Sequence, residues 1–278
     1  MANLAIDAQA QNINFVTKFE ADLHNLLAML GKADVQVMAP GTALKIYKDS
    51  GSLQTVQVAD GEEVTASTLE MVVDKTVELD YKKFRNVVGI KAIGSMGYDI
   101  AVGGVANSML RQVQKGVRSD IVGAVKTGTG TGTQASTFQP AVANTWAALT
   151  AKFEDEAITP LYFVNPTTAA SYLGAANVTM QTAFGLSYIQ NFLGLGTLIV
   201  DSNCEAGKVY GTASENLVVA AANLAAIPGM DYQMDASGII GINTGAKYSN
   251  AGIEINVASG LKVVPEFLDR VIVTTVGA

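Results

Sequence analysis

The chain has 278 residues, which is enough for two modest domains or for one domain with large excursions. Apolar residues make up 49%, so a sizeable core can be buried, and the formal net charge of −7 argues against a basic surface that grips nucleic acid. One cysteine, Cys204, and one histidine, His24, exclude both an intrachain disulfide framework and a zinc site built from these residue types. The sequence shows neither a signal peptide nor an apolar window long enough to span a membrane.

A short amphipathic helix is the first element that the sequence predicts. Between residues 11 and 30, apolar residues recur three and four positions apart, and Gly31 closes the run. Nothing adjacent in the sequence offers this apolar face a partner, so we expect something distant to cover it. We therefore take Phe15, Phe19 and Leu23 as candidate subunit contacts.

An extended hairpin is predicted next. The segments "TALKIYKDS" and "SLQTVQVA" have strand patterns, "DGEE" is a turn, and "STLEMVVDKTVELDYKKF" alternates apolar and charged residues. An isolated hairpin is marginally stable in water, and the inward face of this one is too polar for a sandwich core. We therefore expect the ribbon to pack on another molecule. The candidate contacts are Asp60, Gly61, Glu62, Glu63 and Lys75.

Residues 97–126 carry the strongest helical pattern in the chain. Apolar residues lie three or four positions apart along its whole length and form one stripe. Four glycines within it each cost about 1 kcal/mol of helix propensity relative to alanine, so we expect tertiary contacts, with close backbone approach, to hold the helix. The glycines are Gly103, Gly104, Gly116 and Gly123.

An α/β block with short connections follows a Gly/Thr loop at 127–140, which is a predicted domain boundary. We expect a helix at 145–153, a buried strand at 161–166 and a short helix over "TTAASYLG". Strand patterns dominate again from 239 to 278.

Several stretches resemble functional motifs, but each lacks a residue or a spacing that the chemistry requires. "TGTGTGT" lacks the Lys-Ser/Thr that ends a phosphate-binding loop. "DSNCEAG" at 201–207 resembles the start of a calcium loop, but its glycine falls one place late and no glutamate follows, so we expect a tight turn. The acidic runs at 62–63 and 154–156 are sequence neighbours on predicted turns, which favours solvated carboxylates over an acid–base pair. We therefore expect no enzyme activity and no catalytic, cofactor-binding or metal-binding residue, with Cys204 a buried filler and His24 a plain helix residue.

Several stretches, in this order, resemble the major capsid proteins of tailed bacteriophages, whose Hong Kong 97-type fold is shared with encapsulins. They are "VADGEEVTAST", "TVELDYKKFRNVVGIKAIGSMGYDI", "AVKTGTGTGTQASTFQP", "LYFVNPTTAASYLG" and "GLGTLIVDSNCEAGKVYGT". Their order and spacing extend the resemblance over nearly the whole chain.

The resemblance implies an α+β fold in five parts. These are an N-terminal arm (1–41), an extended E-loop hairpin (42–92), a peripheral domain with a spine helix (93–140), an axial domain (141–240) and return strands of the peripheral domain (241–278). In this family the E-loop lies across the neighbouring subunit, and the axial domain lines the local five- and six-fold axes.

The resemblance implies a major capsid protein, which assembles into hexamers and pentamers of an icosahedral shell around double-stranded DNA. The expected location is the virion, after synthesis in the cytoplasm of the host bacterium, without sequence-specific DNA binding, cofactor or membrane partner. Some members of the family carry an N-terminal scaffolding segment, whereas this chain begins close to the arm. We therefore expect either a separate scaffolding protein or removal of such a segment, together with a portal. Two alternatives stay open: an encapsulin-type compartment with a protein cargo, and another self-assembling tube or surface-layer protein.

Overall fold

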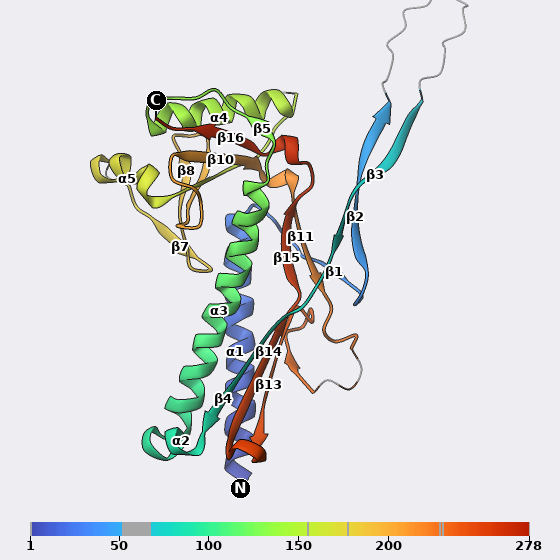
Figure 1. Cartoon of the computed structure of the whole chain (residues 1–278), viewed down its shortest axis with the longest axis vertical. Helices are drawn as coiled ribbons and strands as arrows, with labels where there is room; N and C mark the ends of the chain where they lie inside the picture. Colours follow the sequence, from blue (N-terminus) through green and yellow to red (C-terminus); the bar gives the residue numbers. More distant parts are fainter. Residues whose placement is uncertain are drawn as a thin grey trace, which may run out of the picture.

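Two long helices and the sheets packed on them form the body of the protein (Figure 1). The computed structural model describes residues 2–51, 68–154, 156–176, 178–227, 229 and 231–277. The helices α1 (Ala2–Met29) and α3 (Tyr98–Lys126) run side by side along the long axis. A second layered unit lies at one end of this pair, and a two-stranded hairpin projects from the body.

Helix α3 confirms the prediction over 97–126. Its buried side chains form one stripe that faces the core, and this stripe includes Val113, Val117 and Ile121. The short helix α2 (Ile90–Met96) precedes α3, and Gly97 joins the two with a φ of 82°, a conformation that glycine adopts without strain.

The glycines of α3 allow a close backbone approach, but none of the described segments makes one. A side chain added at Gly103 or Gly116 would meet only the side chains of Gln11 or Lys82, and Gly104 and Gly123 have no described neighbour within 4 Å. Burial of the apolar stripe is therefore what holds the helix.

Helix α1 is longer than predicted and belongs to the body. Phe15, Phe19 and Leu23 are buried in the main core beside residues of α3 and of the neighbouring sheet. The Phe19 ring meets the ring of Phe184 edge-on, with centroids 5.8 Å apart. The expectation that another subunit covers this apolar face is corrected, because distant segments of the same chain cover it.

A four-stranded sheet packs against the two helices. Its strand order is β12-β13-β14-β4, and every neighbouring pair is antiparallel. The bounds are β4 (Lys82–Gly89), β12 (Gln233–Met234), β13 (Ile240–Lys247) and β14 (Gly252–Ser259). The predicted hairpin of 42–92 is thus too long: β4 leaves it to pair with β14, where Val88 joins the main core and Phe84 packs against it.

A three-stranded sheet, in the order β1-β11-β15, lies under the base of the hairpin. Strand β1 (Gln36–Met38) pairs parallel with β11 (Leu217–Ala222), which pairs antiparallel with β15 (Leu261–Pro265). The predicted N-terminal arm therefore contributes both a helix and a strand to the body.

The second layered unit is a seven-stranded sheet in the order β5-β16-β10-β6-β9-β8-β7. Its strands are β5 (Gly130–Thr131), β6 (Pro160–Val164), β7 (Gln181–Ala183), β8 (Leu186–Phe192), β9 (Gly196–Val200), β10 (Lys208–Ala213) and β16 (Ile272–Thr275). The helices α4 (Phe138–Lys152) and α5 (Pro166–Ala175) belong to the same unit, and three single turns occur elsewhere: η1 (Ser214–Asn216), η2 (Tyr248–Asn250) and η3 (Leu268–Arg270). All five residues of β6 are buried, which confirms the predicted strand there.

The boundaries predicted at 140/141 and 240/241 do not match this sheet. Strands β5 and β16 lie outside 141–240 but belong to it, while β11 and β12 lie inside that range and join other sheets. Helix α4 also begins at Phe138, seven residues before the predicted start at 145, because Phe138, Ala141 and Val142 already face its core.

Candidate assembly surface

The projecting hairpin consists of β2 (Ala43–Gly51) and β3 (Leu69–Glu78), paired antiparallel from Ala43 opposite Glu78 to Gly51 opposite Leu69. Its two strands run outward from the body, and no third strand pairs with either of them among the described residues (Figure 1). Four of the predicted contacts, Asp60, Gly61, Glu62 and Glu63, lie outside the described residues.

The base of the hairpin is held by small apolar clusters. Ile46 and Val77 pack on Val264 of β15, and Leu79, just beyond β3, packs on Ala220 and Ala222 of β11. These contacts anchor one face of the base to the three-stranded sheet.

A β-bulge divides the hairpin into two parts with opposite apolar faces. Ile46 pairs with Lys75 but the next residue, Tyr47, pairs with Val73, so Asp74 is the extra residue. Side chains alternate between the faces of a strand, and one extra residue reverses that alternation. The odd-numbered residues of β3 therefore face the body at 75 and 77 but face away from it at 69, 71 and 73.

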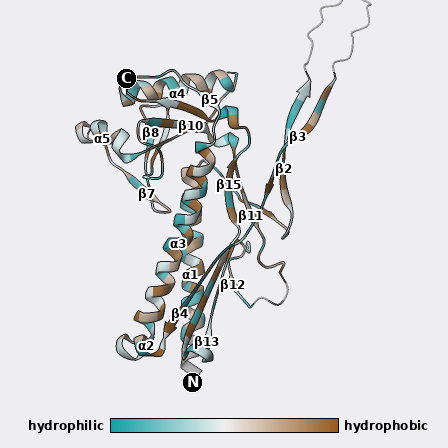
Figure 2. Cartoon of the chain, viewed as in Figure 1, coloured by the Kyte–Doolittle hydropathy of each residue, from teal (hydrophilic) through white to brown (hydrophobic). Residues whose placement is uncertain are grey.

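The reversal leaves an apolar row on the outward face of the hairpin, which we call the outward row. It comprises Tyr47, Leu69, Met71 and Val73, whose exposed fractions are 44%, 45%, 63% and 47%. Figure 2 shows apolar and polar residues mixed along these two strands. Four large apolar side chains in one row, on a ribbon with little core of its own, form a surface suited to contact with another molecule.

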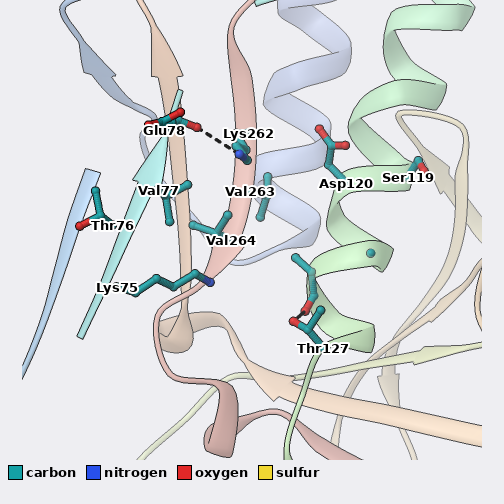
Figure 3. Close-up of a pocket in the computed structure, with 12 residues that line it drawn as sticks. Lys75, Thr76, Val77, Glu78, Ser119, Asp120, Thr127, Lys262, Val263 and Val264 are labelled. Carbon is teal, nitrogen blue, oxygen red and sulfur yellow. Dashed lines mark hydrogen bonds between the residues drawn. The ribbon is translucent and has the colours of Figure 1, made fainter. Parts of the chain in front are cut away.

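A groove lies between the base of the hairpin and the C-terminal half of α3, with β15 between them (Figure 3). Its volume is about 740 Å³, and its lining includes Lys75 of β3 and Lys262 of β15. The Lys262 ammonium donates to the backbone carbonyl of Glu78 at 3.1 Å. Burial lowers the pKa of Lys75, repulsion from Lys262 lowers it further, and Asp74 opposes both effects.

A second apolar patch lies at the other end of the body. Ile90 and Met96 of α2 and Ile100 of α3 are exposed large apolar residues. Ile100 lies off the buried stripe of α3, so the helical pattern alone could have revealed its exposure.

The structure places the acidic residues, the cysteine and the histidine as follows. No group of three or more His, Cys, Asp or Glu side chains in this part of the chain is arranged to hold a metal ion. Cys204 is buried, as predicted, and burial raises its pKa to about 12, so the thiolate nucleophile is not available at neutral pH. His24 is exposed on α1. Within the described helices, none is both long and apolar enough to cross a membrane.

The calcium-loop-like segment is a tight turn between β9 and β10, as predicted. The Asp201 carboxylate accepts hydrogen bonds from the backbone and side-chain nitrogens of Asn203, at 2.8 and 2.9 Å. Both bonds come from the same neighbouring residue, a pattern typical of turns built on aspartate.

A body of two long helices with a three- and a four-stranded sheet, a second unit built on a seven-stranded sheet, and a projecting hairpin define an α+β fold. Solved structures show this fold to be of the Hong Kong 97 type. Neither protein-family models nor curated proteins match the sequence. Solved structures match over most of its length. A capsid protein of cyanophage A-1(L) has a TM-score of 0.57 at 11% identity, covering 88% of this chain and 90% of that chain.

Two further matches come from other kinds of particle. The virus-like particle from Pyrococcus furiosus has a TM-score of 0.52 at 15% identity, covering 90% of this chain and 96% of that chain. The SrpI encapsulin from Synechococcus elongatus has a TM-score of 0.52 at 12% identity, covering 87% of this chain and 84% of that chain. At these identities the likeness establishes the fold, so both the α+β class and the Hong Kong 97 type are confirmed.

Proposed function

We propose that this chain is the structural subunit of an icosahedral shell, and specifically the major capsid protein of a tailed bacteriophage. Copies form hexamers and pentamers, and the closed shell encloses double-stranded DNA without reading its sequence. The subunit is made in the cytoplasm of the host bacterium and ends in the virion, with a scaffolding protein and a portal as partners during assembly.

The observation that carries the proposal is the outward row on a hairpin that extends beyond the body. Contiguous exposed apolar side chains of this size mark interaction surfaces. A surface at the end of an extension meets a neighbour rather than the body that carries it. An extension of this kind lets one copy reach its neighbours in a closed shell.

Each part of the fold then has a role in the shell. The hairpin of β2 and β3 is the E-loop, shortened relative to 42–92 by the departure of β4. The helices α1 and α3 with the three- and four-stranded sheets form the peripheral domain. The seven-stranded sheet, with α4 and α5, forms the axial domain at the capsomer centre.

An encapsulin-type compartment is the second candidate, because the solved encapsulin matches this chain over nearly the same length as the phage capsid. Both candidates share the shell and differ in its contents. Neighbouring genes separate them: portal, terminase and scaffold genes accompany a phage head, whereas a cargo enzyme gene accompanies a compartment.

The test of assembly is expression of the chain, alone and with its neighbouring genes, followed by sedimentation velocity and electron microscopy. We expect capsomers or closed shells, and a stable monomer at high concentration under all these conditions would contradict the proposal. The variant Met71→Asp/Val73→Asp is the matched control: it should keep the melting temperature of the free subunit and lose the particles. Nuclease-protected DNA in purified particles supports the phage head, and a stoichiometric foreign protein supports the compartment.

A further inference from the structure

A long stretch of the second unit carries no charged residue. Residues 157–200, which include β6, α5, β7, β8 and β9, contain no Asp, Glu, Lys, Arg or His, whereas charged residues make up 15% of the whole chain. Burial accounts for this in β6, whose residues are all buried. It does not account for α5, where only Ala169 is buried. The exposed faces of α1 and α3, by contrast, carry charges of both signs, including Glu20, Arg111 and Lys115.

Helix α5 and the turn between β8 and β9 form one surface, which we call the uncharged tip. It comprises the exposed residues of α5 and of the turn at 191–195. The ring of Tyr172 on α5 meets the ring of Phe192 in β8 edge-on, with centroids 5.2 Å apart, so the helix and the turn are in contact. The tip lies on the side of the body that faces away from the projecting hairpin (Figure 1).

The charged residues of the β9–β10 turn lie beside the uncharged tip. The Asn165 side chain, at the start of α5, donates to the backbone carbonyl of Cys204 in that turn at 2.7 Å. The Asp201 carboxylate is buried and accepts hydrogen bonds from Asn203. The Glu205 carboxylate pairs with the Lys208 ammonium at 2.7 Å. The charges of the neighbouring turn are therefore buried or paired, and the exposed surface of the tip stays free of charge.

The tip also exposes an apolar side chain in an unfavourable backbone conformation. Leu193 is 42% exposed and has a φ of 53°, in the left-handed region that a bulky residue rarely adopts. Glycine or asparagine takes this conformation more readily and is better suited to contact with water. Depletion of charge and an exposed large apolar side chain are both typical of the centre of a protein–protein interface.

We infer that the uncharged tip is the surface at which identical copies converge around the axis of a ring, so that each tip meets the tips of other copies. Rotational symmetry repeats every charge on such a surface once for each member of the ring, and these like charges repel whatever their sign. A surface without charge avoids this repulsion in rings of five and of six. The inference rests on the proposed function, which places the second unit at the capsomer centre, and adds exclusion of charge as the property that lets both rings close.

The test introduces one charge of either sign at Ser171, an exposed residue of α5. Ser171→Glu and Ser171→Lys should each lower the association constant between copies at least tenfold in sedimentation velocity at low salt, with the melting temperature of the free subunit unchanged. Mixing equal amounts of the two variants should restore association, because opposite charges then meet in one ring. Salt at about 1 M should also restore it, because the screening length falls to about 3 Å. A steric defect would be corrected by neither treatment.

The matched control places the same charges at Gln112, an exposed residue of α3 outside the tip, and should leave association within about twofold of the unmodified chain. Normal association of both Ser171 variants overturns the inference. So does a loss with one sign only, which indicates a partner surface of fixed charge, and so does a loss that neither mixing nor salt restores. The appearance of the full Ser171 pattern at Gln112 overturns it as well.

A variant that does not fold is replaced by a second pair. Ala175→Glu and Ala175→Lys place the charges at the exposed end of α5 and are judged by the same criteria. Failure of the unmodified chain to associate at all contradicts the proposed function itself. Normal association of the unmodified chain together with normal association of the charged variants contradicts only this inference, so the two failures are distinct.

Discussion

Replacing Met71 by serine should weaken contact between copies while leaving the isolated subunit intact. Met71 lies in the outward row, beyond the bulge, and faces away from the clusters that anchor the hairpin base. Serine is short and polar and keeps the strand backbone unchanged. The change therefore removes apolar area only from the surface that a neighbour would cover.

The magnitude follows from the exposed fraction. Complete burial of a methionine side chain contributes about 1.5–3 kcal/mol, and 63% of Met71 is exposed in the single chain. A neighbour that covers it therefore gains about 1–2 kcal/mol at each contact, and its loss lowers the association constant about 5- to 30-fold. The free subunit, in which this area is exposed in both variants, should lose less than about 0.5 kcal/mol.

The assay is the concentration at which half of the subunits assemble, read by sedimentation velocity beside thermal unfolding of the free subunit. Met71→Leu is the matched control, because it keeps the apolar area and should keep assembly. Two results would refute the reasoning. In the first, the Met71→Ser variant assembles as well as the unmodified chain; in the second, the variant lowers the melting temperature of the free subunit by many degrees. The second result would mean that the outward row packs on its own chain.

Three further predictions concern the body. Val113→Asp should abolish folding, because an unpaired charge in this fully buried position costs several kcal/mol. Lys115→Gln on the exposed face of the same helix should change the free energy of unfolding by less than about 0.5 kcal/mol. Equal melting temperatures of the two variants would show that the buried face of α3 is misassigned. The hydrogen bond from Arg85, with other donors, lowers the pKa of Glu254 from 4.5 to about 2. The stability that this carboxylate contributes is therefore complete above about pH 4.5 and disappears as the pH falls through 2, so the melting temperatures of Glu254→Gln and the unmodified chain should converge near pH 2 and differ at pH 7. Cys204, with its pKa raised to about 12, should resist a thiol reagent at pH 8 until denaturant is added; rapid labelling of the folded chain would contradict its burial.

Periodicity in the sequence predicted the elements that depend on local pattern. The stripe of α3 follows from apolar residues at helical spacing, and the buried strand β6 follows from a continuous apolar run bounded by turn residues. The hairpin of β2 and β3 follows from alternation on both sides of a turn. In each case the pattern of neighbouring residues is sufficient to predict the element.

Long-range pairing was not predictable from the same patterns. Apolar and polar residues alternate along both β3 and β4, and no local pattern indicates where the hairpin ends. The sequence near β4 therefore does not show that β4 pairs with β14, some 170 residues later in the chain. The partner of α1 was missed for the same reason, since the segments that bury Phe19 are distant in sequence. No sequence pattern indicates the bulge at Asp74 either, because the pairing register depends on the residues that each strand contacts in the folded protein.

The sheet pairings also constrain the order in which the chain can fold during translation. β4 cannot pair until β14 is made, β11 cannot pair with β15 until β15 is made, and β5 cannot join the seven-stranded sheet until β16 links it to β10. Three of the four sheets are therefore completed by residues after 250. The hairpin is the exception, because its two strands are close in sequence and can pair while the ribosome is still adding the rest. The outward row can thus form early, whereas the three-stranded sheet at the hairpin base needs β15 and is completed late. The surface that we propose for contact between copies can therefore form before the body of its own subunit is complete.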